Sequence, residues 1–289
     1  MRIYIMTDLE GVAGVCDSEN WCRPEGRYYE FGKELLTREV NAAIEGFMSA
    51  GATGFLVADG HGAGAINPAL LHSAAELARY WPAGKAYPFS LDDGRFKYAV
   101  WIGQHPKAGT IRGHLCHTGG MNVRDLCING VSVGEFGAVA LCAGELGVRT
   151  IFASGCQAFT EEAKALVPGI ETVAVKRGTQ DDPGHTLSAT AYRKHNMAAI
   201  HLQPEEARRR IREGARQALL RAGKETFGLV HLPPPYDLVG ILRAQENEPP
   251  RMYRAHHDKS VIALLNTSPA TTSLYAGDPL AIAANGKQQ

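Results

Sequence analysis

The chain has 289 residues, of which 45% are hydrophobic and 21% charged, and its 30 Lys and Arg balance its 30 Asp and Glu. This composition is typical of a globular domain and excludes disordered, collagen-like and coiled-coil chains. Because the formal net charge is zero, no overall field favours nucleic acid or an anionic membrane. We therefore expect neither as a partner, and any ligand must be recognised by a local site.

The N-terminal residues and the cysteines predict a cytoplasmic protein. The apolar run before Asp8 is too short for a signal-peptide core or a membrane span. The six cysteines contain no C-x-x-C pair, so we interpret them as reduced thiols and not as a zinc-thiolate site.

The first half of the chain alternates short apolar runs with stretches of helical periodicity. In chain order we predict a strand over residues 2–6, a helix over 37–50, a strand over 54–58, a helix over 67–80, a strand over 98–102, a hairpin over 127–133, a helix over 135–146 and strands over 150–154 and 172–175. This alternation is typical of a parallel sheet covered by helices.

The pattern changes after about Arg177. An amphipathic, Arg-rich helix is predicted over 204–222, followed by a break at Pro233–Pro235 and strand-like runs over 236–242 and 260–265. We predict an α/β fold with a three-layer α/β/α domain and a mostly parallel sheet over residues 1–180. A smaller α+β subdomain over 181–289 would supply subunit contacts.

Polar residues follow the predicted strands of the first half. In open α/β sheets, ligands bind beyond the carboxyl ends of the strands. The residues at or just after these ends are Asp8, Glu10, Asp59, His61, His105 and Glu135. Carboxylates and imidazoles are the ligands typical of zinc, and one carboxylate can bridge two ions about 3.5 to 4 Å apart.

Each of these residues also has a structural interpretation. Asp8 and Glu10 could lie in a solvated loop or cap a helix. The segment 59–64 could be a Gly-rich phosphate turn, although it lacks the P-loop lysine and the G-x-G-x-x-G spacing. His105 could be a core histidine, and Glu135 could favour the positive end of its helix. Their joint occurrence favours the metal site.

Four segments together resemble the zinc-dependent D-aminopeptidase family associated with dipeptide-transport operons. They are Met6-Thr-Asp-Leu-Glu-Gly-Val-Ala-Gly14, Asp59-Gly-His61, Gly103-Gln-His105 and Ile128-Asn-Gly-Val-Ser-Val-Gly-Glu-Phe-Gly137. Their order and spacing agree with the family over residues 1 to about 176, whereas the C-terminal third is similar only loosely.

The resemblance implies a two-zinc site and a catalytic histidine. Two ions per chain would be bound by Asp8, Glu10, His61, His105 and Glu135, with Asp8 as the candidate bridge. The catalytic histidine would follow His105, in a loop that is one residue longer here than in the family pattern. We prefer His117, which precedes the small hydroxyl residue Thr118, and His114 is the alternative.

The function implied is that of a binuclear aminopeptidase. It would hydrolyse short peptides with free N-termini, including D-amino-acid peptides, through a metal-activated water. The resemblance also implies a homo-oligomer, a decameric ring of two stacked pentamers that encloses the active sites. The alternatives are another metal-dependent amide or phosphate-ester hydrolase and a non-catalytic peptide- or nucleotide-binding α/β protein.

Three other features are interpreted as structural. Lys176 could assist the reaction electrostatically or be a surface lysine at a strand end. Arg208–Arg210 fit a solvated helix face. His256, His257 and Asp258 are adjacent in a predicted loop, where neighbouring side chains rarely point the same way.

Overall fold

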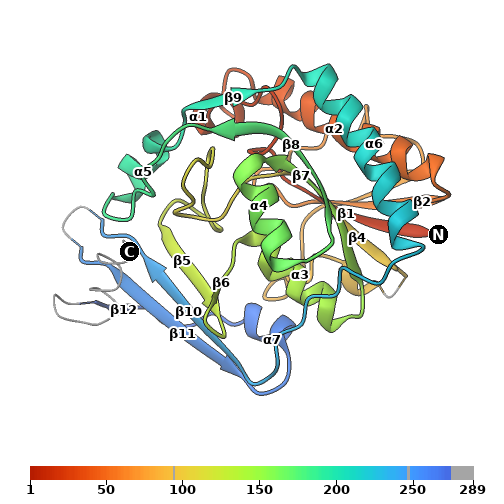
Figure 1. Ribbon diagram of the computed structural model, residues 1–289. Helices are drawn as coiled ribbons and strands as arrows, with labels where there is room; N and C mark the ends of the chain where they lie inside the picture. Colours follow the sequence, from red (N-terminus) through yellow and green to blue (C-terminus); the bar gives the residue numbers. More distant parts are fainter. Residues whose placement is uncertain (94, 246–247, 275–289) are drawn as a thin grey trace.

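The computed structural model describes residues 1–93, 95–245 and 248–274 and has a seven-stranded sheet at its centre (Figure 1). In spatial order its strands are β3 (Ala75–Ala78), β2 (Gly54–Asp59), β1 (Arg2–Thr7), β4 (Tyr98–Gln104), β7 (Arg149–Cys156), β8 (Glu171–Gly178) and β9 (Ala199–His201). All neighbours are parallel except the β8 and β9 pair. The carboxyl ends of β1, β2 and β4 therefore lie side by side at one edge.

Helices cover both faces of this sheet (Figure 1). They are α2 (Tyr29–Ser49) and α6 (Pro204–Ala222) on one face, and α3 (Glu135–Glu145) and α4 (Gln157–Leu166) on the other. Alternation along β1 divides the core between them: Ile3 and Ile5 pack with α2 and α6, whereas Tyr4 and Met6 pack with α3 and α4. The predicted three-layer α/β/α fold with a mostly parallel sheet is confirmed.

A second, antiparallel sheet lies beside the first (Figure 1). In spatial order its strands are β12 (Thr272–Ser273), β11 (Arg251–His257), β10 (Tyr236–Leu242), β5 (Val123–Ile128) and β6 (Val131–Ser132). The boundary predicted near residue 180 does not coincide with the division between the sheets. Strands β5 and β6 precede residue 180 and belong to the second sheet. Strand β9 and helix α6 follow residue 180, but β9 belongs to the seven-stranded sheet and α6 packs against that sheet. Residues 275–289 of the predicted subdomain lie outside the described residues.

Short helical elements complete the described chain. They are α1 (Ser18–Trp21), the 3-10 turn η1 (Leu91–Asp93), α5 (Ala189–His195) and α7 (Val261–Leu265). Among the described residues, no helix combines the length and the apolar character needed to cross a bilayer.

The predicted hairpin around Asn129 and Gly130 is confirmed. These two residues have φ values of 48° and 77°, as a two-residue turn between β5 and β6 requires. The strands predicted around residues 2–6, 54–58, 98–102, 150–154, 172–175 and 236–242 are also present, as are the helices around 37–50, 135–146 and 204–222.

Two segments were assigned to the wrong element by the sequence pattern. The helix predicted over 67–80 is absent, and the segment forms turns and the edge strand β3. Asn41 of α2 accepts from the His72 amide and donates to the Leu70 carbonyl, so these backbone groups are not free for a helix.

The run over 260–265 is helix α7 and not a strand. The Ser260 hydroxyl accepts from the Ala263 amide, and the Glu145 carboxylate accepts from the Val261 amide, so the helix start is capped from two sides. The strand of this region, β11, was not predicted.

Candidate metal centre

The loop that follows β1 places two carboxylates at the sheet edge. The amide of Asp8 donates to the carbonyl of Ile102 at 3.0 Å, and that of Gly11 donates to the carbonyl of Gly103 at 2.7 Å. A Cβ on Gly11 would lie 2.1 Å from the carbonyl oxygen of Gln104, so only glycine allows this approach. The loop thus runs against the end of β4, and Asp8 and Glu10 are buried.

His61, which follows β2, lies between these carboxylates. Its Nδ1 is 3.2 Å from Asp8 Oδ1 and 3.1 Å from Glu10 Oε2. The three side chains are at most 9% exposed. Residues that are separated by more than fifty positions in the sequence therefore form one buried group.

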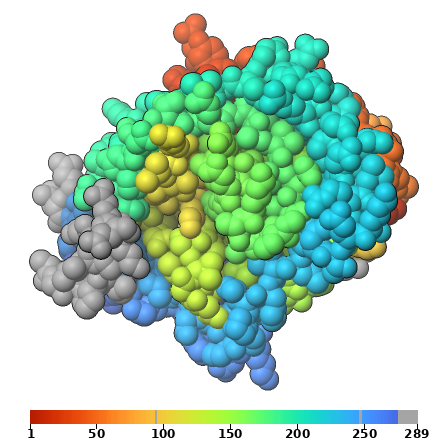
Figure 2. All heavy atoms as spheres, in the orientation of Figure 1, coloured from red at the N-terminus to blue at the C-terminus, as the bar shows by residue number. Residues whose placement is uncertain are grey.

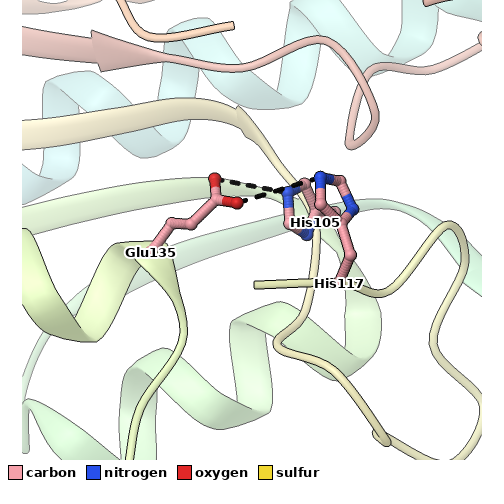
Figure 3. A group of neighbouring side chains, drawn as sticks. All are labelled: His105, His117 and Glu135. Atoms are coloured by element: carbon pink, nitrogen blue, oxygen red, sulfur yellow. Dashed lines mark ion pairs between the residues drawn. The ribbon is translucent and has the colours of Figure 1, made fainter. Parts of the chain in front are cut away.

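A second group adjoins the first through Asp8. His105 Nε2, beyond the end of β4, lies 3.0 Å from Asp8 Oδ2 and 3.4 Å from Glu135 Oε2. His117 Nε2 lies 3.8 Å from Glu135 Oε1, and its ring stacks on that of His105 with centroids 3.8 Å apart and planes 16° apart. Figure 3 shows both imidazoles beside the Glu135 carboxylate at the start of α3.

The histidines have the hydrogen bonds expected of metal ligands. In His61 the outer nitrogen, Nε2, donates to the carbonyl of Cys22 at 2.9 Å. In His105 the outer nitrogen, Nδ1, donates to the carbonyl of Pro106 at 2.9 Å, and the buried Nε2 faces the carboxylates of Asp8 and Glu135. The nitrogen that faces the carboxylates is then free to bind a cation. Together with the oxygen and nitrogen donor set, this arrangement fits zinc.

Electrostatics also point to a cation at this position. Burial alone would raise the pKa of Asp8 and Glu10, but the neighbouring imidazoles outweigh it and lower both, that of Glu10 strongly. Burial alone would lower the pKa of His61 and His105, and the carboxylates raise both well above the ordinary value. The carboxylates thus require positive charge beside them, which protons on the imidazoles or a bound metal can supply.

Glu135 begins α3, and its carboxylate accepts from the Gly119 amide at 2.7 Å. Glu162 of α4 holds the two neighbouring segments together. Its Oε2 accepts from the Lys107 amide at 2.9 Å, and a Cβ on Gly134 would lie 3.0 Å from its Oε1. One half-buried carboxylate therefore aligns the segment after His105 with the start of α3.

The five predicted metal ligands and His117 come together, and the two candidate catalytic histidines are separated. His117 lies in the second group, whereas His114 is buried away from it, with Nε2 donating to the Cys16 carbonyl at 3.1 Å. Asp59 does not join either group, because its carboxylate accepts from the amides of Ala65 and Ile66. It caps the turn that carries His61.

Two further residues of this region, one without an assigned role in the sequence analysis and one with two alternative roles, are placed by the structure. Gln104 donates to Asp8 Oδ2 at 3.0 Å and so orients the carboxylate shared by both groups; its place between Gly103 and His105 was the available signal. Lys176 is buried, so its interpretation as a surface lysine is wrong.

Comparisons with known proteins agree on one family. The family model for D-aminopeptidase, peptidase family M55, matches residues 1–247. The D-aminopeptidase of Bacillus subtilis (strain 168) is 33% identical over 183 residues, which are 61% of this chain and 64% of that protein, so the match spans less than two thirds of it.

A solved structure has the same fold. The Zn-dependent D-aminopeptidase DppA from Bacillus subtilis, described as a self-compartmentalizing protease, superposes with a TM-score of 0.77 at 24% identity. The superposition covers 92% of this chain and 95% of that one.

Proposed function

The chain belongs to the D-aminopeptidase family, and we propose that it is a binuclear zinc aminopeptidase that hydrolyses short peptides with free N-termini, including peptides of D-amino acids. One observation carries this proposal: the two side-chain groups overlap at Asp8, whose two oxygens face His61 and His105 separately. A carboxylate in that position suits a bridge between two ions.

The two groups suggest how the ligands are divided. Asp8, Glu10 and His61 would hold one zinc ion, and Asp8, His105 and Glu135 would hold the other. Zinc supplies Lewis acidity, which makes water a nucleophile near neutral pH and polarises the scissile carbonyl.

His117 would then move protons. Its Nδ1 donates to the Leu115 carbonyl at 2.9 Å, which fixes the ring and leaves Nε2 facing the site. Its side chain is 15% exposed, so a substrate can reach it. Because Nδ1 carries the ring proton, Nε2 would first accept a proton from the attacking water and then give it to the leaving amine, a role for which an imidazole is suited near neutral pH.

The proposal extends to the assembly and the location. DppA is described as self-compartmentalizing, and a closed homo-oligomer, as a decameric ring, would keep large substrates from the metal centre of this chain as well. In the space-filling view, the yellow segment that follows β4 reaches the surface between α4 and the region of α5 (Figure 2).

All six cysteines are free thiols, and we place the protein in the cytoplasm, where thiols stay reduced.

Metal analysis and a substrate panel test the activity. We expect close to two zinc ions per chain after reconstitution. We also expect cleavage of dipeptides and amino-acid amides, and the panel compares the D with the L form of each substrate. Absence of bound metal would contradict the metal centre. Hydrolysis of phosphate esters alone would favour the alternative hydrolase with the same ligands.

Light scattering tests the assembly. A decamer has ten times the chain mass of 31.1 kDa, and a mass near one or two chains would exclude the ring. Digestion of a folded protein as fast as a dipeptide would contradict the enclosed site.

A further inference from the structure

The loop between β1 and α1 (residues 8–17) is held by side chains from four other parts of the chain. Each of the four consecutive residues 13–16 makes a hydrogen bond to one of these side chains through its backbone amide or carbonyl group. The Ala13 amide donates to Glu39 Oε1 at 3.0 Å, and the Gly14 amide donates to His201 Nδ1 at 3.1 Å. Lys176 Nζ donates to the Val15 carbonyl at 3.0 Å, and His114 Nε2 donates to the Cys16 carbonyl at 3.1 Å.

These four side chains, which we call the loop clamp, come from separate elements. Glu39 lies in α2, His114 in the segment between β4 and β5, Lys176 in β8 and His201 in β9. Glu39, Lys176 and His114 are buried, and the rings of His114 and His201 pack edge to face with centroids 5.3 Å apart. Such burial of polar groups is costly unless each hydrogen bond is made.

The charge states match the hydrogen bonds. Burial, helped by the nearby Lys176 ammonium, lowers the pKa of His114 to about 2 and that of His201 to about 4. Both rings are therefore neutral near pH 7. A neutral ring can accept at Nδ1, as His201 does, and donate at Nε2, as His114 does.

The residues that the loop clamp holds, 13–16, lie along the chain between two candidate metal ligands and a residue that orients a third. Asp8 and Glu10 begin the loop, and α1 follows it and leads to Cys22, whose carbonyl accepts from His61. The loop has no regular secondary structure, and Gly14 has φ of +88°. Apart from the clamp, backbone hydrogen bonds from residues 8 and 11 to β4 fix the start of the loop against the sheet.

We propose that Glu39, His114, Lys176 and His201 are positioning residues that fix the β1–α1 loop and thereby set the geometry with which Asp8, Glu10 and His61 hold zinc. The inference rests on the proposed function, because zinc is the group whose binding it explains. Outer residues that orient metal ligands affect metal affinity by about 10- to 100-fold.

Paired substitutions at the two histidines test the proposal. Gln at position 114 places an amide N–H near the position of Nε2, and Asn at position 201 places an oxygen near that of Nδ1, whereas Leu removes the bond at either position. We expect His114→Leu and His201→Leu to weaken zinc binding by about 10- to 100-fold, and His114→Gln and His201→Asn to retain most of the wild-type affinity. Zinc affinity is measured by competition with a chromophoric chelator.

A control separates positioning from general destabilisation. Leu219→Ala removes a buried side chain near the C-terminal end of α6, fifteen residues after Pro204, which approaches Gly14 of the loop. It lowers the melting temperature of the zinc-free protein. We expect it to bind zinc as the wild type does. If the Leu variants bind zinc as tightly as the wild type, or if Leu219→Ala weakens binding equally at equal loss of stability, the inference is wrong.

The same titration distinguishes the two proposals. A wild-type protein that binds no zinc overturns the proposed function together with this inference. A wild-type protein that binds zinc, with Leu variants that also bind it normally, overturns the inference alone.

Discussion

Histidines and carboxylates meet on the antiparallel sheet and at the ends of the parallel strands, and of these two places the second has the features of a metal centre. On the antiparallel sheet, His256 of β11 contacts Asp237 at 2.8 Å and Asp258 at 3.1 Å, with the three side chains 53%, 68% and 84% exposed. At the parallel strand ends, the same residue types are buried or half-buried and converge from four segments.

The second nitrogen of each ring makes the difference clear. Both nitrogens of His256 face carboxylates, so protonation alone satisfies the ring, and water screens the pairs. His61 and His105 each direct one nitrogen to a backbone carbonyl and the other to carboxylates. Residue type is therefore a weaker sign of a metal centre than burial combined with fixed ring orientation.

Loss of the shared carboxylate should have the largest effect on the buried cluster. Asp8→Ala removes the side chain that faces His61, His105 and Gln104 at once. We expect loss of most of both zinc ions and of measurable peptidase activity, as determined by elemental analysis and peptide hydrolysis. Full zinc occupancy in this variant would show that Asp8 does not bridge the ions.

Loss of His117 should affect turnover more than metal retention. His117→Ala is expected to keep its zinc and to lose activity by about 10² to 10⁴, the usual range for a general acid or base. Steady-state kinetics and zinc analysis on the same sample measure both effects. If His114→Gln shows this phenotype while His117→Ala remains active, the assignment of the catalytic histidine is wrong.

The buried Glu39 should make stability depend on pH in a way that exposed carboxylates do not. Burial raises its pKa to about 7, against the opposing effects of the Ala13 amide, Lys176 and Arg208. The folded protein then holds an extra proton between the ordinary value of 4.5 and about 7, so stability falls as pH rises through this window.

Glu39→Gln removes that dependence and keeps an oxygen for the Ala13 amide. We expect the variant to gain about 2 kcal/mol relative to wild type between pH 5.5 and pH 8. Urea unfolding of the zinc-free proteins at both pH values measures this gain. A difference that is the same at both would mean that the carboxyl titrates at its ordinary pKa.

The exposed cluster should give the smallest effect. His256→Ala removes two solvent-exposed ion pairs, so we expect no measurable change in stability. Zinc content and peptidase activity should equal those of the wild type. A loss of zinc would mean that the surface cluster, too, binds metal.

The convergence of the candidate ligands could be predicted because these residues follow strands, and parallel strands bring their carboxyl ends together. The choice between His114 and His117 needed the three-dimensional path of a loop, since both lie within three positions of each other. The burial of Glu39 could not be predicted from the sequence, because a glutamate in an amphipathic helix is ordinarily exposed. The prediction of a helix over 67–80 was wrong for a similar reason. The side chain of Asn41, which lies in a helix distant in sequence, makes hydrogen bonds to the backbone of this segment.

The segment between β4 and β5 joins the two sheets, and it carries both histidines of the second group. His105 directly follows the parallel sheet, while the Asn122 carbonyl at the other end accepts from the amide of Arg243, next to β10 of the antiparallel sheet. His117 lies between these anchors, with its ring parallel to that of His105. The His117 amide donates to the carbonyl of Pro106, the residue next to His105, so the stacked rings are fixed to each other at the junction between the two sheets.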